Sequence, residues 1–218
     1  MGIAADNLPM SANEEDGPEG IAVDLGEEIA SRLNAEAEFI SVSQANAIQY
    51  LNDGVIDCYI GLAAPDIRTL GQIQSIDMLL DYRIVAVTAS WSQKDRLVEL
   101  SGENICVISG SDANVALDEC TAFKAAMGEI KYCDSYVEMQ RELTGSTCEA
   151  AITDEMKFMH FAGVGRNKFK VIDEPLESGD YIIAFGSRET ELCERIQSIY
   201  NDIYADGTLN KFKIRWVG

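Results

Sequence analysis

Two acids end an apolar run in the second half of the chain. Ala150–Ile152 leads through Thr153 into Asp154 and Glu155, and a helical pattern of apolar residues begins at Met156. In open parallel sheets, ligands bind outside the carboxyl ends of the strands, where the next helix starts. An acid there faces the ligand crevice, where it can pair with a positive charge. Helix capping by Thr153 and Asp154 alone is the competing and, for an isolated motif, commoner explanation.

An arginine follows a different apolar run. Gly61, Ala63, Pro65 and Arg68 lie in one short segment after a buried strand pattern. Gly61 permits close backbone approach, and Pro65 can start a helical turn. Arg68 would then project toward the strand ends, where its planar fork suits a carboxylate. A solvated surface arginine paired with Asp66 fits the spacing equally well.

A third motif, Gly110-Ser111-Asp112-Ala113-Asn114, follows the strand pattern that ends at Ile108. A Gly-Ser turn that opens a helix offers backbone N–H groups to an anion. Most turns of this kind only cap the helix, so the motif alone is weak.

Evidence for catalysis is thin. His160, the single histidine, lies six positions after Asp154 and does not share its helix face. The chain has no Gly-x-Ser-x-Gly elbow, phosphate-binding loop or dinucleotide fingerprint. The sequence therefore predicts no catalytic residue, no metal and no cofactor.

The cysteines show neither metal-type spacing nor a CxxC pair. Cys58, Cys106 and Cys148 lie in apolar strand patterns, which predicts that they are small buried hydrophobes. Cys120 and Cys133 form the pair most worth testing for a disulfide.

The charge balance excludes several classes of partner. The 37 acidic and 17 basic residues give a formal net charge of -20. Such a surface repels phosphate backbones and anionic lipids, so nucleic-acid and membrane-surface binding are not expected. No apolar run reaches the roughly 20 residues of a membrane span, and no signal peptide precedes the first strand pattern at Ile3. Both ends resemble trimmed domain boundaries, so a signal or anchor is expected outside this sequence.

Strand and helix patterns alternate throughout, which predicts α/β architecture built on a mainly parallel sheet. The predicted strands are 3–5, 38–42, 55–60, 82–89, 104–108, 129–132, 149–152, 169–172 and 181–185. The predicted helices are 21–33, 45–51, 114–126, 135–143, 189–204 and 209–216. The last two helices follow the strand predicted at 181–185. Residues 13–20 read as an acidic loop.

Two segments, Leu51–Ile60 and Leu143–Ile152, echo each other. Each ends a helix, turns through glycine and enters a buried strand, with Leu, acid and Ile at the same offsets. This weak signal predicts two lobes of similar construction that share a crevice.

In order along the chain, these pieces resemble the bacterial extracellular solute-binding proteins, family 3, which serve polar amino-acid ABC transporters. The residues that carry the resemblance are Pro9, Gly20–Leu25, Gly54, Asp57, Arg68, Gly110–Ser111, Thr153–Glu155, Ala205–Leu209 and Arg215–Gly218. It covers nearly the whole chain.

The resemblance implies a type 2 periplasmic-binding-protein fold, with two Rossmann-like α/β lobes joined by two crossing hinge strands. Lobe 1 would be residues 1–87 plus 183–218 and lobe 2 residues 88–182, with the ligand cleft between them. The family implies no enzyme activity, but capture of a small polar solute, an amino acid or related zwitterion. Its partner would be an ABC permease in the membrane, and the protein would act as an extracytoplasmic monomer.

The resemblance also assigns roles to site residues. Arg68 would clamp a ligand α-carboxylate with backbone amides near Gly61, Ala63 and Ser111, and Asp154 would accept from the α-ammonium. Asn7 and Asp112 complete the predicted site.

Several positions depart from the family pattern. Asn7 stands in a region where an aromatic residue commonly stacks on the ligand, and Ala63 replaces a Ser or Thr that usually donates beside the carboxylate. The run from Asp57 to Arg68 is also one residue shorter than usual, so fewer donors remain for a carboxylate. Residues 7–11 are similar to a branch associated with quinoprotein dehydrogenases.

Two alternatives remain open from the sequence. A ligand-sensing ectodomain fused to a signalling domain would use the same fold. A dehydratase-like enzyme would need a general acid or base in the crevice, for which Glu155 and His160 are the best candidates.

Overall fold

The chain forms two compact units in a computed structural model that describes residues 1–63 and 73–218. Unit 1 consists of Met1–Asp81 and Gly179–Gly218, and unit 2 of Tyr82–Ser178. Both units combine strands with covering helices, so the predicted α/β class is confirmed.

The chain passes from one unit to the other twice, each time within a long strand. These strands are β7 (Ile73–Ala89) and β11 (Phe169–Gly186). The predicted lobe boundaries, after residues 87 and 182, lie within the same two strands and stay a prediction.

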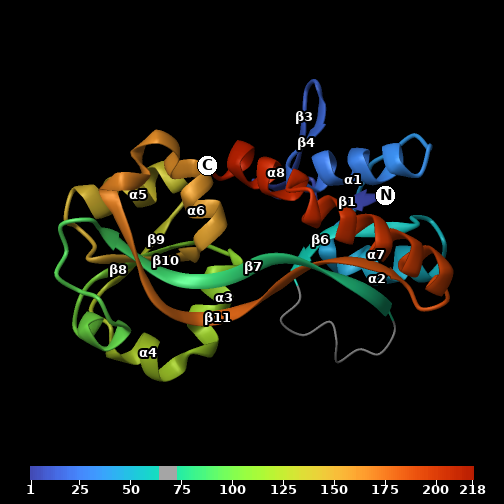
Figure 1. The fold of residues 1–218 in the computed structure, drawn as a ribbon. Coiled ribbons are helices and arrows are strands. Elements are labelled where there is room, and N and C mark those ends of the chain that lie inside the picture. The colour runs from blue at the N-terminus through green and yellow to red at the C-terminus, as the bar shows by residue number, and fades with distance from the viewer. Residues whose placement is uncertain (64–72) are drawn as a thin grey trace. The chain divides into compact units, whose positions relative to one another are not determined.

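Unit 1 places helices on both faces of its sheet. Its other elements are β1 (Gly2–Ile3), β2 (Asp6–Asn7), β3 (Ser11–Glu14), β4 (Gly17–Glu19), α1 (Ile21–Arg32), β5 (Ile40–Ser41), α2 (Gln44–Asn52), β6 (Cys58–Ala63), α7 (Thr190–Ala205) and α8 (Thr208–Trp216). The strand order is β5-β1-β6-β11, in which β1 is parallel to β5 and β6, and β11 is antiparallel to β6. Helices α1, α7 and α8 pack on one another (Figure 1).

The opposite face of the unit 1 sheet packs on α2. Burial of its apolar side chains drives this contact, because removing apolar surface from water is the main favourable term in folding. The buried residues are Val42, Ala47, Leu51, Ile56, Tyr59, Leu62, Ile182 and Ala184.

The segment predicted as an acidic loop, residues 13–20, is instead largely a β-hairpin. Strands β3 and β4 pair antiparallel, with Glu14 opposite Gly17, and β2 adds to β3. The hairpin projects as a narrow loop from unit 1 (Figure 1). Because most of its side chains are exposed and polar, the sequence lacks the alternation that marks a half-buried strand.

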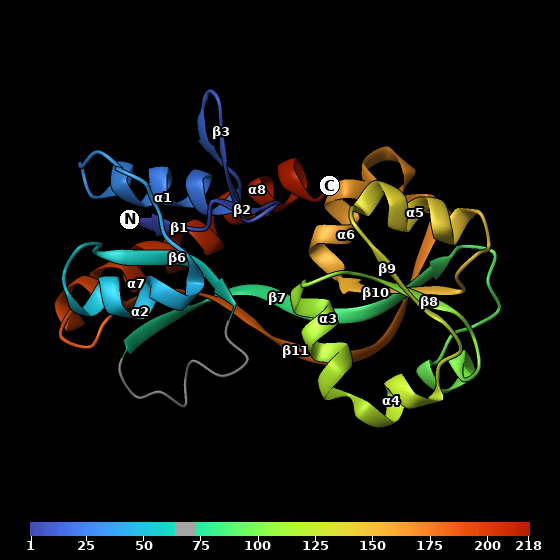
Figure 2. The same cartoon turned by 180° about the vertical axis from the view of Figure 1, so that it is seen from behind.

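Unit 2 also has helices on both faces of its sheet. Its elements besides the two long strands are η2 (Leu97–Leu100), β8 (Ile105–Ile108), α3 (Asp112–Glu119), α4 (Thr121–Ala126), β9 (Ile130–Cys133), α5 (Tyr136–Thr144), β10 (Ala150–Asp154), α6 (Glu155–Ala162) and η3 (Gly163–Lys168). The strand order is β7-β10-β8-β9, with β8 parallel to β9 and β10. Helices α3 and α4 lie on one side of these strands and α5 and α6 on the other (Figure 2).

Three predicted elements are wrong in extent. The predicted helix 114–126 is broken at Cys120, whose ψ of 58° is not helical, so α3 and α4 are separate helices. The predicted short strands 169–172 and 181–185 are parts of one continuous strand, β11.

The echo between Leu51–Ile60 and Leu143–Ile152 is a structural repeat. In one turn the Gly54 and Val55 N–H groups donate to the carbonyls of Leu51 and Tyr50, at 3.2 and 2.9 Å. In the other turn, the N–H groups of Ser146 and Thr147 donate to the carbonyls of Leu143 and Glu142, at 3.2 and 3.0 Å. In both turns the acceptors lie three and five residues before the donors. Both turns lead from a helix into a buried strand, as predicted.

All six cysteines are free, so the suggested pairing of Cys120 with Cys133 is wrong. The Cys120 thiol lies 3.9 Å from the Leu176 carbonyl, whereas Cys133 is buried in the core beneath α5. Cys58, Cys106 and Cys148 are buried, as predicted. Among the described residues, no helix is long and apolar enough to cross a membrane.

Candidate functional site

Asp154 lies where the sequence places it, at the carboxyl end of β10. Its side chain is almost completely buried, and its Oδ1 accepts a hydrogen bond of 2.9 Å from the Lys157 backbone N–H. Asp154 is therefore the N-cap of α6, as the simpler of the two sequence interpretations predicts. A cap uses one hydrogen bond of a carboxylate that can accept about four, so this role does not exclude ligand binding.

The predicted Gly-Ser turn follows β8, the parallel neighbour of β10. Ser111 caps α3, because its Oγ accepts from the Asn114 N–H at 3.2 Å and donates to the Ile108 carbonyl at 2.8 Å. The Gly110 N–H donates to Asn114 Oδ1 at 3.1 Å. Much of the turn's hydrogen-bonding capacity is thus used internally, which limits its value as an anion seat.

Lys157 links the two strand ends. Its backbone N–H bonds Asp154, and its Nζ lies 3.4 Å from Asp112 Oδ2. Sequence reasoning missed this residue, although its position three residues after the helix cap is a usable signal. The structure therefore brings the predicted residues Asp112 and Asp154 to the same edge of the unit 2 sheet.

Two tyrosines lie in the electric field of these acids. Burial raises the pKa of the Tyr82 phenol well above its usual value, and the negative charges of Asp112, Glu177 and Asp154 raise it further. Burial, followed by the charge of Asp154, likewise raises the pKa of Tyr136. Both phenols are therefore neutral at physiological pH.

We call Asp112, Asp154 and Glu177, with the phenols of Tyr82 and Tyr136, the acidic site of unit 2. Its carboxylates accept hydrogen bonds and carry negative charge, whereas its aromatic rings attract cations through their faces. The arrangement suits an ammonium or guanidinium group. Glu177, which lies in the middle of β11, was not predicted as a site residue because nothing in its local sequence sets it apart.

In unit 1, Gly61 and Ala63 lie at the carboxyl end of β6. The pairing of β6 with β11 shifts register between Ile182 and Ile183, which leaves Gly61 as a bulge with a φ of 83°. A Cβ on Gly61 would lie 2.3 Å from Met10 Cγ, so glycine is required by space as well as by conformation.

Asn7 is the last residue of β2, in the segment that follows β1, the parallel neighbour of β6. Its side chain is buried, and its carbonyl accepts from the Met10 N–H at 2.9 Å. The contact of Met10 with Gly61 therefore brings this region to the end of β6. Arg68 lies outside the described residues.

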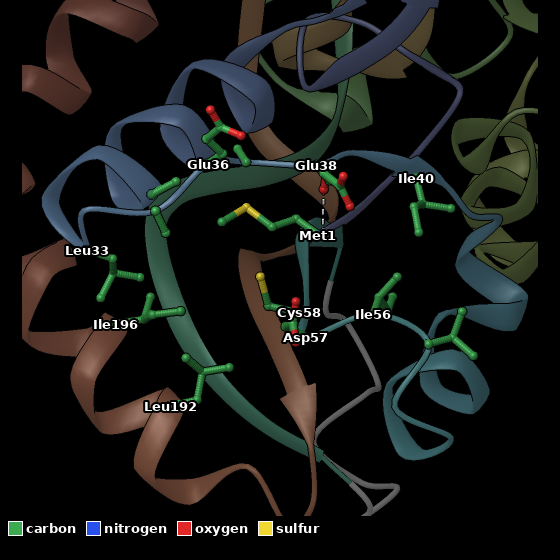
Figure 3. Close-up of a pocket in the computed structure, with 14 residues that line it drawn as sticks. Met1, Leu33, Glu36, Glu38, Ile40, Ile56, Asp57, Cys58, Leu192 and Ile196 are labelled. Carbon is green, nitrogen blue, oxygen red and sulfur yellow. Dashed lines mark hydrogen bonds between the residues drawn. The ribbon is translucent and has the colours of Figure 1, made fainter.

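A cavity of about 420 Å³ in unit 1 lies at the opposite end of β6 (Figure 3). Asp57 and Cys58, at the amino end of the strand, line it, and Leu33 and Ile196 contribute apolar walls. The Met1 ammonium donates to the Glu38 carbonyl at 2.7 Å. None of the predicted site residues that the structure describes lines this cavity or the cavity of about 550 Å³ at residues 51–54 and 186–189. Within the described part of the chain, no cluster of His, Cys, Asp or Glu is placed to hold a metal ion.

The strand order of each unit and the position of the acids define a periplasmic-binding-type protein. A family model described as bacterial extracellular solute-binding proteins, family 3, matches residues 1–218. The chain belongs to this family, and the predicted type 2 periplasmic-binding fold is confirmed. The family consists of binding proteins.

The following relatives are distant in sequence. An amino-acid ABC transporter-binding protein of Vibrio harveyi is 20% identical over 221 residues, covering 100% of this chain and 88% of that protein. An ancestral cationic amino acid solute-binding protein has a TM-score of 0.83 at 19% identity and covers 100% of this chain and 94% of its own. The second substrate-binding domain of an amino acid ABC transporter from Streptococcus pneumoniae has a TM-score of 0.79 at 19% identity, with coverage of 100% and 98%. At these identities the solved structures support the fold.

Proposed function

We propose that the chain binds a free amino acid outside the cytoplasm and delivers it, as a monomer, to an ABC permease in the membrane. The observation that carries the proposal is the acidic site of unit 2, in a chain that belongs throughout its length to a solute-binding family. The names of the relatives in Vibrio harveyi and of the ancestral protein, which refer to amino acids, support the same ligand class.

In this proposal Asp154 accepts hydrogen bonds from the α-ammonium of the ligand. Its burial favours the role, because a charge pair is stronger where water is excluded. Asp112 and the phenols of Tyr82 and Tyr136 add negative charge and aromatic surface beside it.

The α-carboxylate is assigned to Arg68, assisted by backbone amides near Gly61, Ala63 and Ser111. The bulge at Gly61 supports the assignment, since bulges re-aim the chain at the ends of strands and are common beside binding sites. Asn7, which lies in β2, is a further candidate contact.

A thermal-shift screen over amino acids tests the proposal. Each hit is compared with its decarboxylated amine and its deaminated acid, so that both charges of the zwitterion are removed in turn. A ligand at 100 times its Kd should raise the Tm by roughly 5–10 °C, and neither analogue should match it. Stabilisation by amines or acids alone, or by no amino acid, would contradict the proposal.

The role of Arg68 is tested with Arg68→Ala and with Arg166→Ala as a control arginine elsewhere in the chain. Arg68→Ala should remove the ligand-induced shift and leave the fold of the unliganded protein intact. An unchanged affinity in isothermal titration calorimetry would remove Arg68 from the site.

A further inference from the structure

The cavity of about 420 Å³ in unit 1 has no part in the proposed amino acid site. It lies between the end of α1, the start of β5 and one side of α7 (Figure 3). These elements contribute Leu33, Ile40, Leu192 and Ile196 to its lining. Because every lining residue belongs to unit 1, the cavity is a feature of this unit alone.

The interior of the cavity is apolar. Ile56, Cys58 and Ile196 line it and are buried, with exposed fractions of 3%, 2% and 2%. Figure 3 shows the sulfur atoms of Met1 and Cys58 turned toward the middle of this space. Both sulfurs are polarizable and pack well against hydrocarbon. Such an interior favours an apolar group over water.

The size of the cavity and the exposure of its edge fit a small organic ligand. An apolar cavity of about 150 Å³ is enough to bind benzene, and ligand sites commonly measure roughly 300–1,000 Å³. Ile40 and Val55 line the cavity with exposed fractions of 42% and 52%. Exposed apolar side chains beside a cavity are a common mark of a binding site, because a ligand removes them from water.

The charges that line the cavity are mainly negative. Glu36, Glu38 and Asp57 are all exposed, so they lie where the apolar interior meets solvent, at the mouth of the cavity. The Met1 ammonium is the one positive charge among the described lining residues, and it donates to the Glu38 carbonyl at 2.7 Å. The carboxylates therefore outnumber it, and the net charge of -20 adds to the negative potential.

We propose that this cavity is a second binding site, which takes a small amphipathic cation: an ammonium group carried on an apolar chain or ring. The apolar part lies against Leu33, Leu192 and Ile196, and the ammonium lies among the carboxylates at the mouth. A metal ion does not fit, because no group of His, Cys, Asp or Glu in the described part of the chain is placed to hold one. The inference is independent of the amino acid site proposed above.

Isothermal titration calorimetry with three hexyl compounds tests the proposal. Hexylamine, hexan-1-ol and hexanoate share an apolar chain and differ in charge, and the amine is protonated at about pH 7, as a lysine side chain is. Hexylamine should bind most tightly and hexanoate least. High salt should reduce this preference, because it screens exposed charges. From butylamine to hexylamine, each added methylene should tighten binding about fourfold.

A charge-reversing variant locates the site. Leu192 is half-buried on α7, so Leu192→Lys adds a positive charge to the lining without disturbing the core. It should weaken hexylamine binding by about tenfold or more and strengthen hexanoate binding, because like charges repel and opposite charges attract. Ile214→Lys, at an exposed position of α8 that does not line the cavity, is the control and should change neither affinity.

Two further variants complete the test. Replacing Glu36, Glu38 and Asp57 together by Gln, Gln and Asn should reduce the affinity for hexylamine to that for hexan-1-ol, even if Leu192→Lys fails to fold. Asp154→Asn should leave hexylamine binding at the cavity unchanged. No binding of hexylamine, equal affinities for the three hexyl compounds, or hexylamine binding that survives Leu192→Lys would overturn the proposal. Loss of hexylamine binding in Asp154→Asn alone would also overturn it, by assigning the amine to the acidic site of unit 2.

Discussion

Gly54 and Ser146 occupy equivalent positions in the two turns that repeat within the chain. Their φ angles are 70° and 56°, and each donates its N–H to the leucine carbonyl three residues earlier at 3.2 Å. The first turn has glycine in the left-handed conformation, which glycine adopts without strain. The second has Ser146 there, for which the same conformation is strained.

Exchange of the two residue types should therefore have opposite effects. Gly54→Ser should lower the free energy of unfolding by about 1 kcal/mol, and Ser146→Gly should raise it by up to about 0.5 kcal/mol, since relief of strain is partly offset by unfolded-state entropy. Urea denaturation measures both. Gly165→Ser, at a glycine with ordinary φ and open space, is the control and should not destabilise. Changes of equal sign at Gly54 and Ser146 would contradict the equivalence.

Asp154 combines a structural role with the proposed ligand role, and two substitutions separate them. Asn caps a helix about as well as Asp, so Asp154→Asn should leave the unliganded Tm nearly unchanged but weaken amino acid binding about 10- to 100-fold. Asp154→Ala should also lower stability by about 1 kcal/mol. Calorimetry gives the affinity and thermal denaturation the stability.

The control for Asp154 is Ser135→Ala, which removes the cap of α5 in the same unit. It should cost about 1 kcal/mol of stability with unchanged affinity. If Asp154→Asn bound amino acids as tightly as the natural chain, the carboxylate would be a cap and no more.

The last helix is attached through Asp24 of α1. Its Oδ2 accepts from Trp216 Nε1 at 2.8 Å, and its Oδ1 lies 3.1 Å from Arg215. Asp24→Ala should destabilise the protein by about 1–2 kcal/mol, because the partly buried indole N–H loses its acceptor. Asp24→Asn, which can still accept, should cost less. Tryptophan fluorescence during urea unfolding reports both, and equal losses would assign the effect to charge alone.

Asp206 should contribute to the acid sensitivity of unit 1. Hydrogen bonds from Thr208 and Arg32 hold the pKa of Asp206 at about 2, below its usual 3.8. Because the folded pKa is depressed, the stabilisation is present above about pH 4 and is lost as the pH falls through about 2. Asp206→Asn should therefore show a smaller fall in Tm between pH 4 and pH 2 than the natural chain. Asp202→Asn on the same helix is the control, and an identical fall in all three proteins would refute the assignment.

The sequence predicted most elements because their apolar patterns are strong. Helices α1 and α7 carry continuous apolar stripes, and β10 is buried along its whole length. The middle of β11 escaped prediction since it carries acids, Pro175 and Gly179 and lacks a buried face to give alternation. The break between α3 and α4 at Cys120 was also missed, because no glycine or proline marks it in the sequence.

The site residues that lie at the ends of strands could be predicted from the sequence. Asp154 and Asp112 follow neighbouring parallel strands, so their convergence could be inferred from topology. The positions of Lys157 and Glu177 in the site could not be inferred, because they depend on side-chain packing between elements distant in sequence.

The chain crosses between the two units within β7 and β11, and this order has a consequence for biosynthesis. Every residue of unit 2 has been added to the chain before Gly179, whereas unit 1 waits for the end of β11 and for α7 and α8. We therefore expect the inserted unit to mature first on the nascent chain, and the contact of Trp216 with Asp24 to be among the last formed, as synthesis ends.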